Sequence, residues 1–258
     1  MLSKNQKKLI ASMAQKKHRD SQHLFLAEGP KTVTDLLESG IEPSLIVHTQ
    51  EWKLPSSCIT DSNILFPVSQ KDLASTSLLK TPQQVLALFK QPQHSFNNNA
   101  IYKELTLVLD GIQDPGNMGT IIRLADWFGI NQIICSIDTV DIFNPKVVQA
   151  TMGAVARIKI HYTNLPEFFQ QYHEKCDNPI YGTYLEGDNI YKTSLISPSL
   201  IVMGNEGRGI RDENKNYIRH KITIPTFPAD SQTSESLNVG VATAIVCSEF
   251  RRSTTYSR

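Results

Sequence analysis

The segment IVMGNEGRGI (residues 201–210) decides the fold, together with KITIP (221–225) and SLNVGVATAIVCSEF (236–250). The apolar runs Leu200–Met203 and Lys221–Ile224 have the length and β-branched content of buried strands, and each ends at glycine or proline. The third segment predicts a helix that packs one face on a sheet, formed by Leu237, Val241, Ala244, Ile245 and Ser248. Loops at the carboxyl ends of strands bind ligands in open α/β sheets, so we expect a binding edge here.

The glycines of the first segment do not match the common nucleotide-binding loops. Gly204, Gly207 and Gly209 give G-x-x-G-x-G, which differs from the dinucleotide pattern G-x-G-x-x-G, and the chain has no G-x-x-x-x-G-K-[ST] phosphate loop. Glycine lets a backbone approach a flat or charged group closely, because no Cβ stands in the way. Taken alone, however, a glycine-rich turn is more often only a turn.

Composition limits the class of protein. The chain has 258 residues, 40% of them hydrophobic, which is enough for a sizeable core in two modest domains. The formal net charge is +1, so a surface for nucleic acid must be local. The four cysteines are far apart, with no C-x-x-C pair and no histidine at ligand spacing, which argues against a zinc site and a disulfide framework. We expect no metal and reduced thiols.

The chain shows no targeting or membrane signal. Its first residues, MLSKNQKK, lack the apolar core of a signal peptide. No apolar run approaches the ~18 residues of a membrane span. We therefore expect a soluble, cytoplasmic protein.

Strand and helix alternate between residues 24 and 89, which predicts a small α/β domain over residues 1–92. The expected elements are strands at Leu24–Ala27, Ser44–His48, Ile64–Val68 and Val85–Phe89, and helices at Lys31–Ser39 and after Ser69. Residues 93–103 are polar and asparagine-rich, as in an interdomain linker. The second domain is expected to span residues 104–258.

A basic amphipathic helix is predicted at the start of the first domain. Ser3 and Gln6 form a capping-box pattern, and Leu9, Ile10 and Met13 recur at helical spacing. The other face is expected to present a basic patch, made of Lys4, Lys7, Lys8, Lys16, Lys17 and Arg19. Such a patch is either a solvated helix face or, in an RNA-binding protein, a surface that contacts phosphates.

The second domain opens with an apolar run, Leu105–Leu109, followed by DGIQDPGNMGTIIR (residues 110–123). This pattern predicts a strand, a loose glycine turn and a helix. Asn117 and Arg123 lie six residues apart, so both can point toward the ligand edge. The alternatives are that Asn117 is only a helix cap and that Arg123 is only solvated.

Taken together, these segments resemble three motifs of SpoU-type RNA 2′-O-ribose methyltransferases, within the knotted SPOUT class. The first motif is matched by Asp114, Pro115, Asn117, Gly119, Arg123, Ala125, Phe128 and Gly129, the second by Gly204, Glu206, Gly207 and Ile210, and the third by Ile224, Pro225, Ser236, Leu237, Asn238 and Val239. The first domain resembles the family's substrate-binding domain at FLAEGPKTVTDLL (residues 25–37). The chain departs from the family in the longer segment 226–235 and in having Gly240 where many members have serine.

The resemblance implies a fold that general rules would not suggest, because knotted chains are very rare. The expected fold is α/β. It has a C-terminal trefoil-knotted methyltransferase domain, which follows a smaller N-terminal α/β substrate-binding domain. The loops at Gly204, Ile224 and Leu237 would bind S-adenosylmethionine. The C-terminal domain would form a homodimer, with no membrane association.

The resemblance also implies an RNA ribose methylation site. Arg123 would take the proton of the 2′-hydroxyl, with Asn117, Glu206, Ser236 and Asn238 ordering the pocket. A charged guanidinium offers no proton acceptor, so Arg123 is alternatively a clamp on an RNA phosphate. The favoured substrate is ribosomal RNA, with transfer RNA second. A non-catalytic, ribosome-associated RNA-binding protein and a non-RNA nucleotide-binding enzyme are the other hypotheses.

Overall fold

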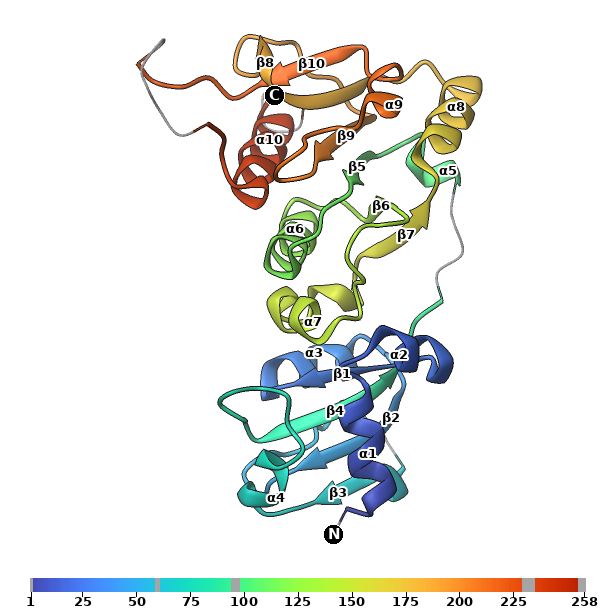
Figure 1. Cartoon of the computed structure of the whole chain (residues 1–258), viewed down its shortest axis with the longest axis vertical. Coiled ribbons are helices and arrows are strands. Elements are labelled where there is room, and N and C mark those ends of the chain that lie inside the picture. The colour runs from blue at the N-terminus through green and yellow to red at the C-terminus, as the bar shows by residue number, and fades with distance from the viewer. Residues whose placement is uncertain (1, 59–60, 94–97, 229–234, 255–258) are drawn as a thin grey trace. The chain divides into compact units, whose positions relative to one another are not determined.

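A computed structural model describes residues 2–58, 61–93, 98–228 and 235–254. The chain forms two compact units (Figure 1). Unit 1 comprises residues 1–93 and 141–157, and unit 2 comprises residues 94–140 and 158–258. Unit 1 is therefore discontinuous in sequence, whereas the sequence predicted two continuous domains.

Unit 1 is built on a four-stranded mixed sheet in the order β1-β4-β2-β3. Strand β4 runs antiparallel to β1 and β2, and β3 runs parallel to β2. The strands are β1 (Leu24–Glu28), β2 (Pro43–His48), β3 (Leu65–Pro67) and β4 (Val85–Lys90). The helices are α1 (Lys4–Ser12), α2 (Lys16–Gln22), α3 (Pro30–Glu38), α4 (Gln70–Ala74) and α7 (Pro145–Thr151), with 3-10 turns η1 (Ser62–Ile64) and η2 (Ala154–Ala156). The predicted alternation of strands and helices is confirmed.

The sheet of unit 1 is buried on both faces, because alternate side chains along each strand point to opposite sides. Leu26, Val47 and Leu88 pack in one cluster with Ile10 and Met13 near α1. The opposite cluster contains residues of all three longest strands, α3 and the 141–157 segment: Phe25, Val33, Ile46, Phe89, Val148 and Val155. The segment 141–157 thus completes the core of unit 1.

The N-terminal basic segment forms two helices rather than one. The predicted capping box begins α1, since the Ser3 hydroxyl accepts from Gln6 N–H at 3.2 Å and the Gln6 side chain accepts from Ser3 N–H at 2.8 Å. Helix α1 ends at Ser12, and α2 begins again at Lys16. Met13 between them is fully buried. The break turns α2 so that Arg19 points into the unit.

Unit 2 is built on a six-stranded sheet in the order β10-β8-β9-β5-β6-β7. Every pair of neighbouring strands is parallel. The strands are β5 (Leu105–Asp110), β6 (Gln132–Ser136), β7 (Lys159–Thr163), β8 (Ile180–Asn189), β9 (Ser199–Gly204) and β10 (His220–Thr223). The helices are α5 (Asn98–Ile101), α6 (Pro115–Trp127), α8 (Leu165–Lys175), α9 (Asp212–Lys215) and α10 (Val239–Thr254).

Helices cover both faces of this sheet. On one face Phe169 and Tyr172 of α8 pack with Val108, Leu200 and Val202. On the other face α6 and α10 pack against each other and α10 reaches β9 (Figure 1). Burial of both faces explains why the central strands β9, β5 and β6 are near-continuous buried runs rather than alternating ones.

The predicted buried face of the last helix is wrong. Val241 is 51% exposed and Leu237 is 48% exposed, and Leu237 lies before the helix begins. The buried residues of α10 are instead Val239, Gly240, Thr243, Val246, Cys247, Glu249 and Phe250. The segment VGVATAIVC is apolar or small almost all round, so its periodicity does not select one face.

Candidate functional site

The loops that follow β8, β9 and β10 surround a cavity of about 1020 Å³ in unit 2. Its walls include five of the residues predicted for the site: Gly204, Glu206, Ile224, Ser236 and Leu237. The three strands are parallel, so their carboxyl ends meet at one edge. This arrangement agrees with the binding edge predicted from the sequence. Of the longer segment 226–235, residues 229–234 lie outside the described residues.

The loop after β9 folds back on itself. Asn205 and Gly209 exchange backbone hydrogen bonds of 3.0 and 2.9 Å, and the Asn205 side-chain oxygen accepts from Gly207 N–H at 3.0 Å. A Cβ on Gly204 would lie 2.5 Å from the backbone nitrogen of Ile210, closer than real Cβ contacts allow. Gly204 is therefore needed for the tight loop that places Glu206 at the cavity.

A chain of side-chain hydrogen bonds links the three motifs beside the cavity. Asn117 Nδ2 donates to Glu206 Oε1 at 2.9 Å, and Asn238 Nδ2 donates to Asn117 Oδ1 at 2.8 Å. The Oδ1 atom of Asn238 accepts from the Gly240 N–H at 2.9 Å, at the start of α10. Asp114, rather than Asn117, caps α6, because its Oδ1 accepts from Asn117 N–H at 2.8 Å. The Asn117 side chain is thereby left to join the other two motifs.

A buried carboxylate that sequence reasoning missed ties the first two motifs together. Asp110, at the end of β5, has a fully buried side chain and accepts from Arg211 N–H at 2.9 Å and Arg211 Nε at 2.6 Å. It also accepts from Asn214 Nδ2 at 2.8 Å. Asn205 Nδ2 donates to the Gly111 carbonyl at 2.7 Å. The available signals were an acidic residue closing an apolar strand and an arginine directly after the second motif.

Arg211 lies between two carboxylates, since its Nη2 atom is also 3.0 Å from Asp138 Oδ1. Burial acts to raise the pKa of Asp138, but hydrogen bonding to Ser136 and the guanidinium of Arg211 hold that pKa below its usual range. Burial acts to lower the pKa of Arg211, and the hydrogen bond and charge of Asp110 raise it above its usual value. Arg211 therefore holds the second-motif loop against β5 through its hydrogen bonds to Asp110.

Arg123 stands apart from this chain of hydrogen bonds. It is exposed on α6, less than two turns beyond Asn117, and it does not line the cavity. Within the described ranges it makes no hydrogen bond or ion pair. The guanidinium is consequently available to a ligand outside the chain.

The structure exposes only part of the predicted basic patch. Lys4, Lys8, Lys16 and Lys17 are exposed, whereas Lys7 is half-buried with its Nζ 3.4 Å from Ser75 Oγ. Arg19 was predicted wrongly as an RNA contact, because its side chain is only 2% exposed. Its guanidinium donates to Asp141 Oδ2 and to the Met13 carbonyl. Arg19 therefore connects the N-terminal helices to the 141–157 segment.

The cavity has the mixed chemistry that S-adenosylmethionine requires. Ile190, Ile210, Ile222 and Leu237 supply apolar wall, while Glu206 and Lys221 supply opposite charges. Its volume lies at the upper end of the usual range of about 300–1,000 Å³ for small-molecule sites.

Tyr184 adds a polar group to the same wall. Its hydroxyl is buried and, among the described residues, has no hydrogen-bond partner. Lys221 Nζ lies 5.4 Å from the centre of the Tyr184 ring. Burial and the nearby charge of Asp110 raise the pKa of Tyr184, so this hydroxyl remains neutral. The residues present therefore fit the cofactor.

The described part of the chain contains no cluster of three or more histidine, cysteine or acidic side chains suited to a metal ion. No helix within those ranges is long and apolar enough to cross a membrane.

Comparison with known proteins gives matches over both units. The model of the SpoU rRNA Methylase family matches residues 104–248, and the model of the MRM3-like substrate binding domain matches residues 4–87. The 23S rRNA (guanosine(2553)-2′-O)-methyltransferase RlmP of Bacillus subtilis is 30% identical over 252 residues, which cover 96% of this chain and 97% of that protein.

Solved structures agree with this match. A protein of the TrmH family of RNA methyltransferases from Porphyromonas gingivalis is 38% identical, with a TM-score of 0.85 over 98% of this chain and 99% of that one. An AdoMet-bound rRNA methyltransferase from Sinorhizobium meliloti is 31% identical, with a TM-score of 0.85 over 98% of this chain and 97% of that one.

Proposed function

Because the chain belongs to the SpoU rRNA methylase family, we infer that it transfers a methyl group from S-adenosylmethionine to a ribose 2′-hydroxyl of RNA. The observation on which this function rests is the hydrogen-bonded chain Asn238–Asn117–Glu206 at the cavity. Residues from all three motifs, up to 121 positions apart, meet there, and each of the three side chains is hydrogen-bonded to another of them. The protein is an RNA methyltransferase.

The chain's own residues hold the cofactor and the acceptor in place. S-adenosylmethionine supplies an electrophilic methyl group on a positively charged sulfur. The loops at Gly204, Ile224 and Leu237 form the proposed cofactor walls, and Glu206 and Ser236 line the same cavity. Such positioning supplies much of the rate enhancement when two bound groups must meet in line. Asn117 and Asn238 keep the Glu206 carboxylate oriented.

Arg123 is the proposed catalytic residue, with two possible roles. As a base it would accept the proton of the 2′-hydroxyl, and as a clamp it would bind an RNA phosphate through two parallel hydrogen bonds. Its exposure and lack of partners within the described residues support a contact with RNA. The clamp agrees better with the high proton affinity of guanidinium.

Ribosomal RNA is the proposed substrate, with transfer RNA as the alternative. Two matches support this proposal: the Bacillus subtilis relative is named as a 23S rRNA methyltransferase, and residues 4–87 match the MRM3-like substrate binding domain. Residues 1–92 are proposed to bind this RNA, with phosphate contacts from Lys4, Lys7, Lys8, Lys16 and Lys17. The proposed location is the cytoplasm, in line with the proposed ribosomal substrate.

The catalytic domain, proposed over residues 104–258, is proposed to be knotted and dimeric. In support of the knot, β10 lies at the sheet edge beside β8, whereas α10 returns to β9 and α6. In support of a homodimer, Trp127 of α6 is 83% exposed and Val241 of the neighbouring α10 is 51% exposed. Large exposed apolar side chains on adjoining helices suit a second copy of the same surface.

Two measurements, one on the purified chain and one on cellular RNA, test the proposed function. Calorimetry should detect binding of S-adenosylmethionine or its demethylated product and none of NAD. Mapping 2′-O-methyl groups in RNA from cells with and without the gene should show at least one ribosomal nucleotide whose methylation is lost. Binding of NAD with neither methyl-donor species bound would refute the function, and loss confined to transfer RNA would refute only the ribosomal substrate.

A further inference from the structure

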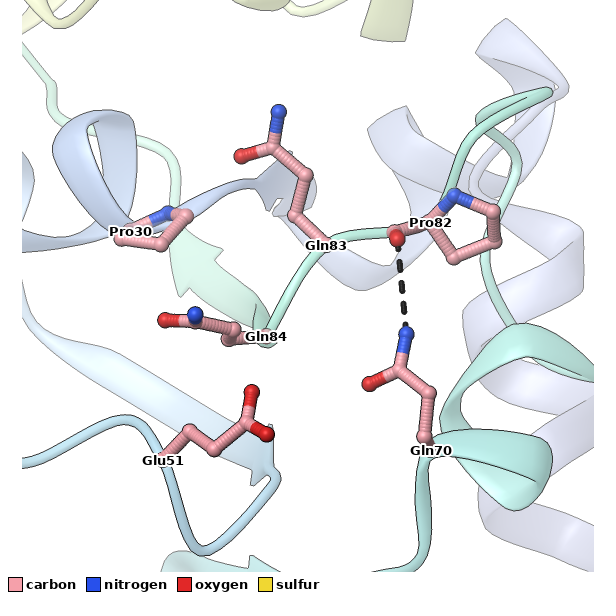
Figure 2. A pocket seen from close by; sticks show the side chains of 6 residues that line it. All are labelled: Pro30, Glu51, Gln70, Pro82, Gln83 and Gln84. Carbon is pink, nitrogen blue, oxygen red and sulfur yellow. Dashed lines mark hydrogen bonds between the residues drawn. The ribbon is translucent and has the colours of Figure 1, made fainter.

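A second hollow, of about 330 Å³, lies in unit 1 and is lined largely by amide side chains. Figure 2 shows the six residues that surround it: Pro30, Glu51, Gln70, Pro82, Gln83 and Gln84. The side chains of Glu51 and Gln70 point toward the Pro82–Gln84 segment (Figure 2). Strands β1, β2 and β3 run in one direction, so the hollow lies at the edge where their carboxyl ends meet.

The backbone around the hollow is firmly held. Gly29 N–H donates to the Val85 carbonyl at 2.9 Å, and Thr49 N–H donates to the Gln84 carbonyl at 2.9 Å. Buried Glu28 accepts from Leu78 N–H at 3.0 Å and from the Ser77 hydroxyl. These bonds fix the path of the loop that leads into Pro82–Gln84. The hollow is therefore a preformed feature of unit 1.

The side chains of the hollow are largely free to bind a ligand. In the described structure these six side chains make one hydrogen bond, from Gln70 Nε2 to the backbone carbonyl of Pro82, at a long 3.5 Å. The Gln83 amide lies over Gly29, where a Cβ would come within 2.7 Å of its oxygen. Gly29 also has a φ of +94°, so glycine serves this close approach.

The donor and acceptor groups match the edge of a nucleobase. A glutamine amide pairs a donor with an acceptor on one side and bonds adenine bidentately, while a glutamate accepts from the amino group of cytosine. Sequence-specific RNA recognition acts on unpaired bases, whose edges and faces are accessible. The volume is about a third of the cofactor cavity, which suits one base better than a whole dinucleotide.

Basic side chains flank each segment of the rim. Within two residues of a lining residue stand four exposed lysines, namely Lys31, Lys53, Lys71 and Lys80. Lysines around a polar hollow attract phosphates whatever the sequence of the RNA. This set is separate from the lysines of α1 and α2.

We propose that the hollow lined by Gln83, Gln84 and Glu51 binds an unpaired nucleobase of the RNA substrate, with Lys31, Lys53, Lys71 and Lys80 contacting the adjoining phosphates. This site rests on the proposed function, because it recognises the RNA that the catalytic domain methylates. It gives unit 1 a base-reading role in addition to electrostatic binding.

Fluorescence anisotropy on the full chain tests the site with labelled RNA decamers. The probes are single strands rich in adenine, cytosine or uracil, a mixed single strand that contains guanine, and a ten-base-pair duplex. The wild-type chain should bind at least one single strand about tenfold more tightly than the duplex, as expected for one well-made base contact. Gln83→Ala with Gln84→Ala should remove this preference and leave duplex affinity unchanged.

Two further variants make the test specific. Glu51→Gln replaces two acceptors by an acceptor and a donor at nearly constant shape, so it should change which base is preferred rather than abolish binding. Gln15→Ala with Gln22→Ala is the matched control, since both glutamines are exposed on unit 1 outside the hollow. This control should retain the wild-type preference.

The proposal is overturned if the Gln83/Gln84 variant keeps the single-strand preference, or if the control variant loses it equally. It is also overturned if free AMP, CMP, GMP or UMP binds more tightly than every decamer, because the hollow would then be a small-molecule site. Binding of S-adenosylhomocysteine to unit 2 is measured in parallel. If the wild-type chain neither binds this product nor methylates RNA, the proposed function is refuted. If the Gln83/Gln84 variant keeps the wild-type base preference, only this site is refuted.

Discussion

Replacing Arg19 should destabilise unit 1 strongly, because its charge is buried and its hydrogen bonds go to groups within the protein. The side chain of Arg19 is 2% exposed and that of Asp141 is 13% exposed. The guanidinium donates from Nη2 to Asp141 Oδ2 at 2.5 Å, from Nε to the same oxygen at 3.0 Å, and from Nη1 to the Met13 carbonyl at 2.7 Å. Arg19→Ala leaves the carboxylate and the carbonyl without these donors.

The size of the effect follows from the burial of both partners. Removing one member of a buried ion pair costs about 3–5 kcal/mol, whereas an exposed surface substitution changes stability by less than about 0.5 kcal/mol. For a urea dependence of about 2 kcal/mol per molar, Arg19→Ala should lower the unfolding midpoint by about 1.5–2.5 M. The midpoint of Arg19→Lys should fall between those of the wild type and Arg19→Ala, since lysine retains the charge but lacks the planar guanidinium.

Intrinsic fluorescence reports on the correct unit. Trp52 is 6% exposed in the core of unit 1, whereas Trp127 of unit 2 is 83% exposed and already in water. The change in emission during urea unfolding therefore comes chiefly from Trp52. Lys17→Ala is the matched control, because Lys17 lies two residues away on α2 and is exposed. Its midpoint should stay within about 0.3 M of the wild type.

Two results would refute this reasoning. A midpoint for Arg19→Ala equal to that of Lys17→Ala would show that the ion pair does not hold unit 1 together. The salt dependence of RNA binding gives the second test, because each lost phosphate contact lowers its slope. A folded Arg19→Gln variant with a reduced slope would return Arg19 to the RNA-binding surface.

Three further sets of substitutions test unit 2. Arg123→Ala should nearly abolish methyl transfer, with cofactor affinity retained. Arg123→Lys should keep activity that rises with pH only if Arg123 is a base. Near-normal turnover by the alanine variant would exclude both roles. Arg211→Ala should reduce stability by about 1–3 kcal/mol, allowing for its 38% exposed side chain, and should cost less when combined with Asp110→Asn, which neutralises the buried carboxylate. Additive losses in urea unfolding would contradict this coupling. Gly204→Ala should weaken binding of S-adenosylhomocysteine in calorimetry, because its Cβ meets the Ile210 backbone at 2.5 Å, and unchanged affinity would show that the loop adapts.

Local patterns in the sequence determined the elements of the fold. Apolar runs that stop at glycine or proline marked β9 and β10 of unit 2, and the Ser3 capping box marked the start of α1. These signals depend on neighbouring residues, whose backbone preferences and periodicity act within a few positions. The three motifs likewise predicted that Gly204, Ile224 and Leu237 lie at one cavity, because parallel strands end at a common edge.

Only the tertiary structure decided which polar groups meet. Asp110 and Arg211 are 101 positions apart, and Arg19 and Asp141 are 122 positions apart, so no local pattern joins them. A lysine and an arginine on one predicted helix look alike in sequence, yet the break after Ser12 leaves Lys17 in solvent and buries Arg19. The face of α10 was undetermined for a related reason: an almost uniformly apolar helix takes its orientation from the surfaces it packs on, here β9 and α6.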